Sequence, residues 1–519
     1  MDLNTSPLAC GSYCLSATTE LHRNHVQVNG QATFQNPIVY EDFPDNDVFM
    51  GPDNAFYFSA SNFHYSPGAP ILKSYDLVNW QLIGHSIPRL NFGDGYDLAP
   101  GQRAYRGGTW ASTLRYRKSN GLWYWIGCTN FWNTWVFTSK SVEGPWTNSA
   151  NLGGGNCYYD NGLLIDDDDT LYVVYGSGQV NVAELARDGL SQVKSANVLN
   201  ATQVGADSIE GNRMYKINGT YYILNDRPGS TTYIWKSKSP WGPYEAKILV
   251  DSVSSPLQGG GSPHQGSIVQ TPKGRLPVLA PIKWGSDGFP VLVKGTNGQW
   301  GQSYPMPLPA RPLKNWTTTY KFQGNTLPPA FEWNHNPDVT KYTVNNGLTL
   351  STASVTDDIY SARNTLTHRI HGEYPVGTVQ IDFTNMADGD RVCLAAFRDR
   401  SAYIGIHRDG SQYTLTTKFN MTMDEFGGPT LDIGQIKDSK ILPAGVKKIW
   451  LRTKLDARPN GTNDAIFFYS TDGENFIQLS NAYKMYTGWA FFLGYRFGII
   501  NHATKALGGS VKVLSFITA

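Results

Sequence analysis

The chain has 519 residues, which is enough for more than one folded domain, since a domain usually takes about 100–200 residues. Its 43 basic and 42 acidic side chains leave a net charge of +1, which argues against nucleic acid and anionic membranes as partners. Charged residues make up 16% of the chain and aromatic residues 13%; together with 53 glycines and 29 prolines, this predicts a turn-rich, all-β protein.

The start of the chain bears on where the protein works. The first twenty residues, MDLNTSPLACGSYCLSATTE, lack the basic and apolar segments of a signal peptide, and no run of about 18 apolar residues predicts a membrane helix. Six N-x-Ser/Thr sequons favour a secreted, extracellular glycoprotein whose signal has been removed, with a cytosolic chain as the alternative. The sequons begin at Asn4, Asn200, Asn218, Asn315, Asn420 and Asn460. The five cysteines allow at most two disulfides, in a pairing that the sequence leaves open.

Turn motifs recur through residues 30–310 at roughly the spacing of propeller blades, about 40–50 residues. Each has Asn, Asp, Lys or Gly at a tight turn followed by apolar or aromatic residues, as in a β-hairpin. The five copies are Asp53-Asn54-Ala55-Phe56-Tyr57, Asn120-Gly121-Leu122-Trp123-Tyr124, Asp168-Asp169-Thr170-Leu171-Tyr172, Asn218-Gly219-Thr220-Tyr221-Tyr222 and Lys273-Gly274-Arg275-Leu276-Pro277. We interpret residues 30–310 as a five-bladed β-propeller.

The residues eight positions before these turns are candidates for the central channel. They are Asp45, Ser112, Asp160, Glu210 and Gln265. If the strand before each hairpin is the innermost one, equal offsets place all five at one level around the propeller axis. We therefore predict that the three carboxylates converge at one mouth of the channel. The alternative is coincidence, because acids are common in loops before strands.

Residues 311–519 show short alternating runs separated by turns, and they predict a second β domain. The turns include Arg408-Asp409-Gly410, Pro459-Asn460-Gly461 and Thr471-Asp472-Gly473. Strands spaced about 8–12 residues apart are typical of a β-sandwich, here expected to be of jelly-roll type. We expect very little helix in either domain.

The three carboxylates of the propeller fit the hydrolysis of an acetal. This reaction needs a proton for the leaving oxygen and an attacking group at the anomeric carbon, and two carboxyl groups in different protonation states provide both. A third carboxylate beside the acid raises the pKa of that acid by repulsion and keeps it protonated near neutral pH. A non-catalytic sugar-binding propeller is the alternative, but it has no use for a separately tuned acid and base.

Segments along the propeller resemble glycoside hydrolase family 43 in order and spacing. They include Asn36-Pro37-Ile38, Phe43-Pro44-Asp45, Tyr159-Asp160, Glu210-Gly211 and His264-Gln265-Gly266-Ser267. The resemblance implies that Asp45 is the general base, Glu210 the general acid and Asp160 the modulator of the pKa and orientation of Glu210. The family inverts configuration, which implies roughly 6.5–9.5 Å between the carboxyl groups of Asp45 and Glu210.

The second domain resembles the sandwich of some family members in two segments. These are Trp333-Asn334-His335-Asn336-Pro337-Asp338 and Ala362-Arg363-Asn364-Thr365-Leu366-Thr367. The combination is most similar to the fungal arabinoxylan-directed branch. This implies an inverting non-reducing-end α-L-arabinofuranosidase that removes side chains from arabinoxylan, including those on doubly substituted xylose. β-Xylosidase and exo-arabinanase activity are the alternatives within the family; residues 279–285 lack the longer Arg-bearing segment of the β-xylosidase branch, which argues against β-xylosidase.

Four residues are candidates for sugar contact: Phe63, Tyr159, Trp110 and His264. Phe63 matches a family position that walls the sugar pocket, with ordinary packing as an equal alternative. His264 matches a family residue near the propeller axis, and a buried structural histidine is its alternative. We expect no catalytic cofactor and no metal requirement, and a structural calcium ion near His264 stays open. The expected partner is a plant cell-wall polysaccharide, arabinoxylan or arabinan, and the expected state is a monomer.

Overall fold

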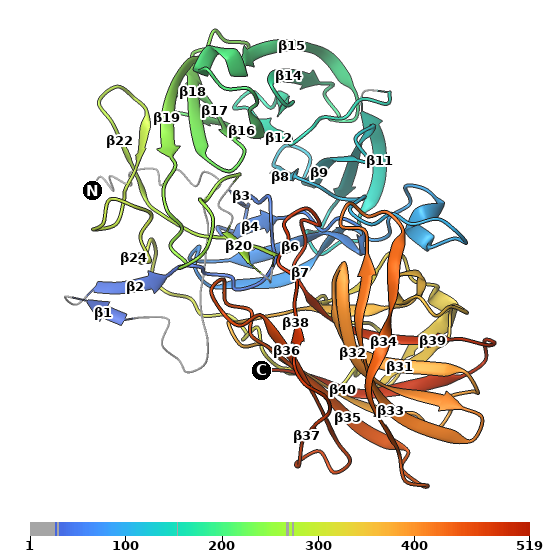
Figure 1. The fold of residues 1–519 in the computed structure, drawn as a ribbon. Helices are drawn as coiled ribbons and strands as arrows, with labels where there is room; N and C mark the ends of the chain where they lie inside the picture. Colours follow the sequence, from blue (N-terminus) through green and yellow to red (C-terminus); the bar gives the residue numbers. More distant parts are fainter. Residues whose placement is uncertain (1–25, 29–30, 153, 266–268, 272–273) are drawn as a thin grey trace.

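The computed structural model describes residues 26–28, 31–152, 154–265, 269–271 and 274–519, and Figure 1 shows two β domains in these ranges. The first is a propeller formed by the strands from β1 to β24 other than β5, and the second is a two-sheet sandwich formed by β5 and the rest of the chain. The predicted all-β fold is therefore confirmed. Across these described ranges, no helix has the length and apolar character needed to cross a membrane.

Four antiparallel four-stranded sheets form the first four blades. Blade one contains β3 (Asp47–Met50), β4 (Phe56–Ser59), β6 (Gly68–Ser74) and β7 (Trp80–Ile87). Blade two contains β8 (Ser112–Arg117), β9 (Leu122–Thr129), β10 (Asn133–Ser139) and β11 (Thr147–Leu152). Blade three contains β12 (Gly162–Ile165), β13 (Leu171–Tyr175), β14 (Gln179–Leu185) and β15 (Gln192–Asn200). Blade four contains β16 (Glu210–Ile217), β17 (Thr220–Arg227), β18 (Thr231–Ser237) and β19 (Glu245–Asp251).

The predicted hairpins join the first two strands of these blades. In blade four, Asn218 and Gly219 have φ values of 50° and 71°, as a two-residue type I′ turn requires. The first strands of neighbouring blades contact one another, β3 with β8, β8 with β12 and β12 with β16. They are therefore the inner strands, as the prediction of the channel residues assumed.

The fifth blade consists of short pairs from both ends of the propeller segment. They are β20 (Val269–Thr271) with β21 (Gly274–Leu276), β22 (Ile282–Trp284) with β23 (Pro290–Leu292), and β24 (Ser303–Pro305) with β2 (Gln31–Gln35), to which β1 (Val26–Val28) is added. In the last pair Phe34 lies opposite Tyr304. A strand from the beginning of the domain thus closes the ring against a strand from its end.

The sandwich consists of a nine-stranded and an eight-stranded sheet, packed over a large apolar core. The first contains β25 (Thr319–Tyr320), β27 (Tyr342–Val344), β28 (Leu348–Ser351), β30 (Val376–Asp382), β35 (Lys448–Leu455), β36 (Asp464–Ser470), β37 (Ile477–Gln478), β38 (Tyr483–Lys484) and β40 (Ser510–Thr518). The second contains β34 (Thr430–Ile441), β33 (Gln412–Met423), β32 (Arg400–Asp409), β31 (Asp390–Phe397), β39 (Arg496–Ala503), β29 (Leu366–Arg369), β26 (Phe331–Asn334) and β5 (Tyr65–Ser66). Alternation sets the faces: in β35, Ile449 and Leu451 are buried and Lys448 is exposed.

Helices in the described ranges are short 3-10 turns. They are η1 (Asp94–Asp97), η2 (Ala201–Val204), η3 (Val339–Lys341) and η4 (Ile359–Ser361). Asp338 and Asp358 cap η3 and η4 by accepting backbone N–H groups. The low helix content agrees with the prediction from composition.

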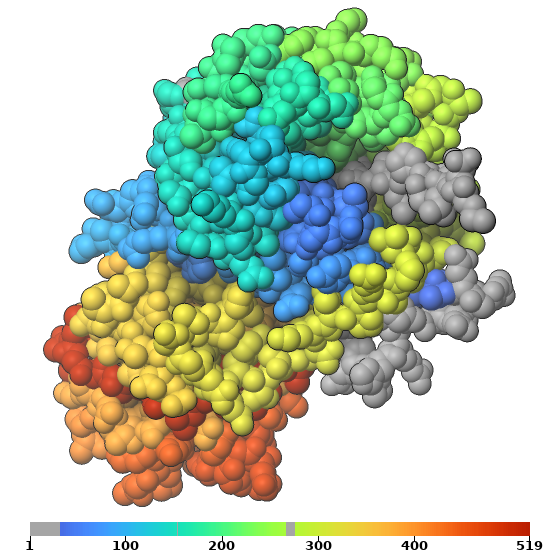
Figure 2. Space-filling view, turned by 180° about the vertical axis from the view of Figure 1, so that it is seen from behind, coloured from blue at the N-terminus to red at the C-terminus, as the bar shows by residue number. Residues whose placement is uncertain are grey.

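The two domains share a β-sheet. Strand β5, which belongs to the chain segment of blade one, pairs with β26 and becomes the last strand of the eight-stranded sheet, with Ser66 opposite Trp333. Figure 2 shows the blue to green propeller and the yellow to red sandwich packed directly against each other. Backbone hydrogen bonds of one sheet therefore cross the domain boundary.

Candidate active site

The three predicted carboxylates lie at the start of the inner strands of three blades. Asp45 and Asp160 precede β3 and β12 by two residues, and Glu210 is the first residue of β16. Asp45 and Asp160 have φ values of 57° and 48°, a conformation that is costly for residues other than glycine and is common at functional sites. The structure thus brings together the three acids that the spacing of the turns selected.

Asp45 is buried and held by contacts to both its side chain and its backbone. The hydroxyl of Ser61 donates to Asp45 Oδ2 at 2.7 Å. The Asp45 carbonyl oxygen accepts a hydrogen bond from the buried guanidinium of Arg213 at 3.2 Å. A carboxylate held in one position suits a general base, which must lie within hydrogen-bond distance of the proton that it removes.

Asp160 and Glu210 are electrostatic neighbours. Asp160 Oδ2 accepts the backbone N–H of Gly211 at 2.9 Å and the side-chain amide of Gln265 at 2.6 Å. Burial raises the pKa of Asp160 well above its usual value, and the charges of Glu210 and Asp45 raise it further. Because repulsion is mutual, two carboxyl groups so placed hold one proton to a higher pH than either would alone.

Tyr159 lies against the same group of acids. Its hydroxyl donates to Glu210 Oε2 at 3.3 Å. Burial raises the pKa of Tyr159, and the charges of Asp160, Glu210 and Asp45 add to the effect, so the phenol keeps its proton as a donor. The predicted pocket residue therefore contacts the predicted general acid.

Arg213 is a buried cation of the site that the sequence analysis missed. It donates to the backbone oxygens of Asn46 and Asn161, and its Nε lies 3.6 Å from Asp47 Oδ1. Its charge partly offsets the rise in the pKa of Asp160. Its place in β16, three residues after Glu210, is the only sequence signal for it.

Asp226 is a fourth buried carboxyl group, and it was also missed. It lies opposite Glu210 in the pairing of β16 with β17. Burial raises the pKa of Asp226 well above its usual value, and Glu210, Asp160 and Asp45 raise it further. The turn at Asn218 contains the signal, because Glu210 is eight residues before it and Asp226 eight residues after it.

A pocket opens beside these acids. It is lined by Trp110, Ala111, Cys128, Phe131, Cys157, Tyr159 and Asp160. Cys128 and Cys157 form a disulfide, so a covalent bond ties the segment before Asp160 to β9. Phe131, which was not among the predicted sugar-contact residues, is half-exposed and stacks on Tyr159 with ring centroids 6.1 Å apart.

The sandwich contributes an aromatic side chain to this region. Phe492, in the segment between β38 and β39, lies 5.4 Å from Trp110 and 6.3 Å from Phe63 between ring centroids. Phe63 itself is fully buried and packs edge-on against Trp110 at 4.9 Å. Trp110 and Tyr159 thus line the pocket, Phe63 lies in the packing next to it, and sugar contact for all three stays a prediction.

His264 is partly buried, and its Nδ1 lies 3.0 Å from the carbonyl oxygen of Ser262. It is not among the residues that line the described pocket. In the described part of the chain, no three or more His, Cys, Asp or Glu side chains are grouped so that they could hold a metal ion. These residues therefore provide no such ligand set for calcium near His264, and the ion stays a prediction.

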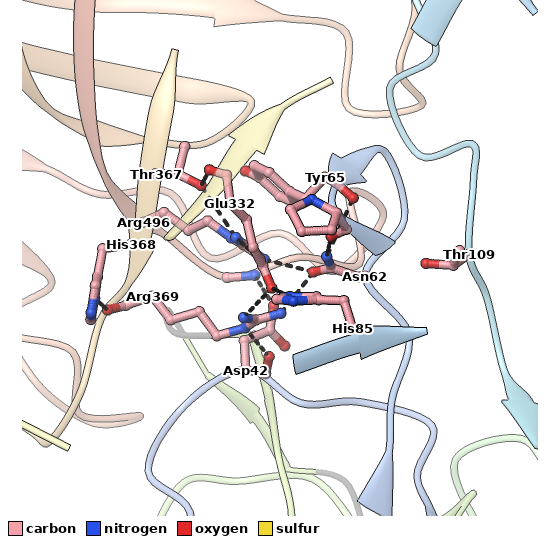
Figure 3. A network of polar contacts seen from close by, with 12 residues as sticks. Asp42, Asn62, Tyr65, His85, Thr109, Glu332, Thr367, His368, Arg369 and Arg496 are labelled. Carbon is pink, nitrogen blue, oxygen red and sulfur yellow. Dashed lines mark hydrogen bonds and ion pairs between the residues drawn. The ribbon is translucent and has the colours of Figure 1, made fainter. Parts of the chain in front are cut away.

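A buried ion network joins the sandwich to the propeller (Figure 3). Glu332 in β26 forms ion pairs with Arg369, at 2.7 Å, and with Arg496, and its Oε1 lies 2.7 Å from His85 Nε2 in β7. All four side chains are buried. Charges buried at a domain boundary are stable only when they are paired in this manner.

The network also supports the loop next to Asp45. Arg369 and Arg496 both donate to Asn62 Oδ1, at 2.7 and 3.0 Å. Asn62 follows Ser61, the residue that binds the Asp45 carboxylate. The sandwich therefore helps to fix the position of Asp45, although it lies outside the propeller.

The site combines a carboxyl group held by donors, Asp45, with a neighbouring pair, Asp160 and Glu210, in which burial and repulsion raise the pKa of Asp160. A base and an acid of this kind, next to a pocket that Asp160 lines, can activate a water molecule and protonate a leaving oxygen. The aromatic lining suits the C–H face of a sugar ring.

Comparison with known proteins agrees with this chemistry. The sequence model of glycosyl hydrolases family 43 matches residues 34–290, and that of the beta xylosidase C-terminal concanavalin A-like domain matches residues 319–516. A solved GH43 glycoside hydrolase, whose engineered active site displays both endo-xylanase and exo-arabinofuranosidase activity, is 42% identical. The match covers 94% of this chain and 99% of that one, with a TM-score of 0.89.

Two curated relatives carry different activities in their names. A beta-xylosidase of Formosa agariphila is 27% identical over 93% of this chain and 90% of its own length. A non-reducing end alpha-L-arabinofuranosidase of Bacteroides ovatus is 31% identical over 59% of this chain and 62% of its own length. Both organisms are bacteria, so these findings support the family predicted from the sequence and do not support its fungal arabinofuranosidase branch.

Proposed function

Because the chain belongs to glycosyl hydrolases family 43, we propose that it is an inverting exo-glycosidase that releases single pentosyl units from xylan. The first candidate for the released unit is the α-L-arabinofuranosyl side chain of arabinoxylan. The observation that carries the proposal is the convergence of Asp45, Asp160 and Glu210 beside an aromatic pocket. The expected surroundings are plant cell-wall material outside the cell, where the Cys128–Cys157 disulfide would persist.

In the proposed reaction, Asp45 removes a proton from a water molecule, and the oxygen of that water attacks the anomeric carbon. Glu210 gives its proton to the leaving glycosidic oxygen, and the bond between that oxygen and the anomeric carbon breaks. Attack from the face opposite the leaving group inverts the configuration. Asp160 acts through Glu210, because its charge disfavours loss of the Glu210 proton before the bond is cleaved.

Two observations support the arabinofuranosidase candidate. The solved relative that displays exo-arabinofuranosidase activity in its engineered form matches nearly the whole chain at 42% identity. The Bacteroides ovatus relative carries that activity in its name.

The second candidate is a β-xylosidase. The name of the Formosa agariphila relative, which matches nine-tenths of this chain, supports it. So does the description of the family model that matches the sandwich. By the names of curated relatives matched over about nine-tenths of their length, this candidate is better supported than the arabinofuranosidase predicted from the sequence.

Proton NMR of a wheat arabinoxylan digest, followed in real time, separates the two candidates. The arabinofuranosidase candidate requires arabinose as the first product, appearing as the β-anomer because the α-linked unit is inverted. Xylose as the first sugar, in its α form, would establish the β-xylosidase candidate instead. Release of a product with retained configuration would contradict the assignment of Asp45 as base, and no product from arabinoxylan or arabinan would favour a binding protein.

Replacement of Asp160 with Asn is expected to shift the basic limb of the pH profile of kcat/KM to lower pH. Asn keeps the shape of the side chain and removes its charge, so the repulsion that keeps the acid protonated is lost and the pKa that governs this limb falls. An Asp168→Asn variant is the control, because Asp168 is exposed in a hairpin turn of blade three. An unshifted profile in Asp160→Asn would contradict the modulator role of Asp160.

A further inference from the structure

Gln265 has a place in the site that the proposed mechanism does not use. It is the blade-five residue in the same series of positions as Asp45, Asp160 and Glu210. Its side-chain amide donates to Asp160 Oδ2 at 2.6 Å, and its backbone N–H donates to Asp226 Oδ1 at 3.0 Å. One residue thus binds two of the four carboxyl groups.

Asp226 provides a firm support for Gln265. It is buried, and among the residues that the structure describes its Oδ2 has no hydrogen-bond partner. A carboxylate in that state would be costly, so Asp226 is the group most easily kept neutral. A neutral Asp226 can hold Gln265 in place without adding a charge beside Glu210.

Gly211 completes the arrangement. Its N–H and the Gln265 amide converge on the same oxygen, Asp160 Oδ2. A side chain at position 211 would bring a Cβ atom to 2.6 Å from Asp226 Oδ1 and 3.0 Å from Gln265 Cγ, and Gly211 has a φ of 71°. The packing of these three residues therefore leaves room only for glycine there.

The two donors matter because Asp160 and Glu210 compete for one proton. N–H groups that point at a carboxylate oxygen stabilise its ionised form, and two of them point at Asp160. The titratable and charged groups that face Asp160 are Glu210, Asp45, Asp226, Tyr159 and the cation Arg213. These two donors favour the ionised form of Asp160 and so act against the burial and repulsion that raise its pKa. Glu210 accepts a hydrogen bond from the Tyr159 hydroxyl at the longer distance of 3.3 Å.

We propose that Gln265 is a positioning residue that, together with Gly211, holds the negative charge of the carboxyl pair on Asp160 and thereby leaves the proton on Glu210. The inference rests on the proposed function, because it assumes that Glu210 is the general acid. Without the Gln265 amide, part of the protein population carries the proton on Asp160, where it cannot reach the leaving oxygen.

The test compares substrates that differ in their need for the acid. In Gln265→Ala, we expect kcat on arabinoxylan oligosaccharides to fall by about 10- to 100-fold, the loss typical of one hydrogen bond to a charged group. We expect kcat on 4-nitrophenyl α-L-arabinofuranoside to change by less than about threefold, because nitrophenolate leaves without a proton. The corresponding xylosides are used if wild type prefers them.

A second variant and a control variant complete the test. Gln265→Glu keeps the shape of the side chain, and its activity on the oligosaccharides is expected to recover as the pH falls, because a protonated Glu regains a donor toward Asp160. Gln179→Ala, at an exposed position in β14, should keep both rates. Equal losses on both substrates, or no loss in either Gln265 variant, would overturn the positioning role. A wild-type protein inactive on both substrates would instead refute the proposed function and this inference with it.

Discussion

Asp45→Ala and Glu210→Ala are each expected to lower the rate of arabinoxylan hydrolysis by about 10²–10⁴-fold, the usual contribution of a general base or acid. The two variants should differ in which substrates they hydrolyse more slowly. Without Asp45 no group activates the water, so every substrate is affected. Without Glu210 only leaving groups that need a proton are affected, and 4-nitrophenyl glycosides should retain most of their rate.

The measurement is kcat on both substrates, with the thermal unfolding midpoint as a check on folding. Asp168→Ala, which removes an exposed carboxylate of the same domain, is the matched control. If a folded Asp45→Ala variant hydrolysed arabinoxylan at nearly the wild-type rate, the assignment of the base would be wrong. A Glu210→Ala variant that lost both substrates equally would show that Glu210 is not simply the acid.

Glu332→Ala is expected to destabilise the whole protein by about 3–5 kcal/mol, because it leaves two buried guanidinium groups without their carboxylate. Arg369 and Arg496 are both nearly inaccessible to solvent and cannot turn to water. Arg369 also donates to the carbonyl oxygen of Asp42 at 2.9 Å, close to the base. We therefore expect a lower kcat as well, although Glu332 does not line the described pocket.

Urea unfolding, followed by tryptophan fluorescence, measures this loss. Asp388→Ala is the control, because it removes a half-exposed ion pair with Lys505 that solvent screens. A Glu332→Ala variant no less stable than this control would contradict the role of the network. A separate unfolding step for the propeller would show that the domains are joined less tightly than β5 and the network imply.

The same carboxylate predicts a pH dependence. Burial raises the pKa of Glu332, but Arg369 and Arg496 hold it well below 4.5. A lowered folded-state pKa gives stability that is present above the unfolded value of about 4.5 and is lost as the pH falls through the folded value. Wild type should therefore lose stability on acidification below pH 4.5 more steeply than Glu332→Ala does.

The sequence predicted the parts of the site that depend on repetition. Hairpin turns recur at a fixed distance in sequence from the inner strands, so counting eight residues back from each turn located Asp45, Asp160 and Glu210 together. Asp226 was missed because residues were counted only backwards from each turn, whereas it lies eight residues after Asn218. Arg213 was missed because it follows a bulge between β16 and β17, and a bulge leaves no clear mark in the spacing. The eight-residue spacing also could not show that Gln265 binds two acids, because that depends on how its blade is placed next to blade four in three dimensions.

The sequence predicted the fold of the sandwich but not its contact with the propeller. The alternation of β35 and similar strands indicates a half-buried sheet, yet says nothing about which surface that sheet meets. Strand β5 is two residues long, too short to give a periodic signal, and its partner in β26 lies far along the chain. The contributions of Phe492 and Glu332 follow from that pairing and could be found only in three dimensions.

The pairing of β2 with β24 also constrains how the protein is made. A ribosome releases the chain from its N-terminus, so β2 emerges long before its partner and waits through the synthesis of four blades. During that time the growing ring stays open, and the inner strands of blades one and four lack the neighbour that will close the circle. Translation speed over residues 36–305, and any chaperone that covers the open ends, therefore influence how much of the protein reaches its closed form.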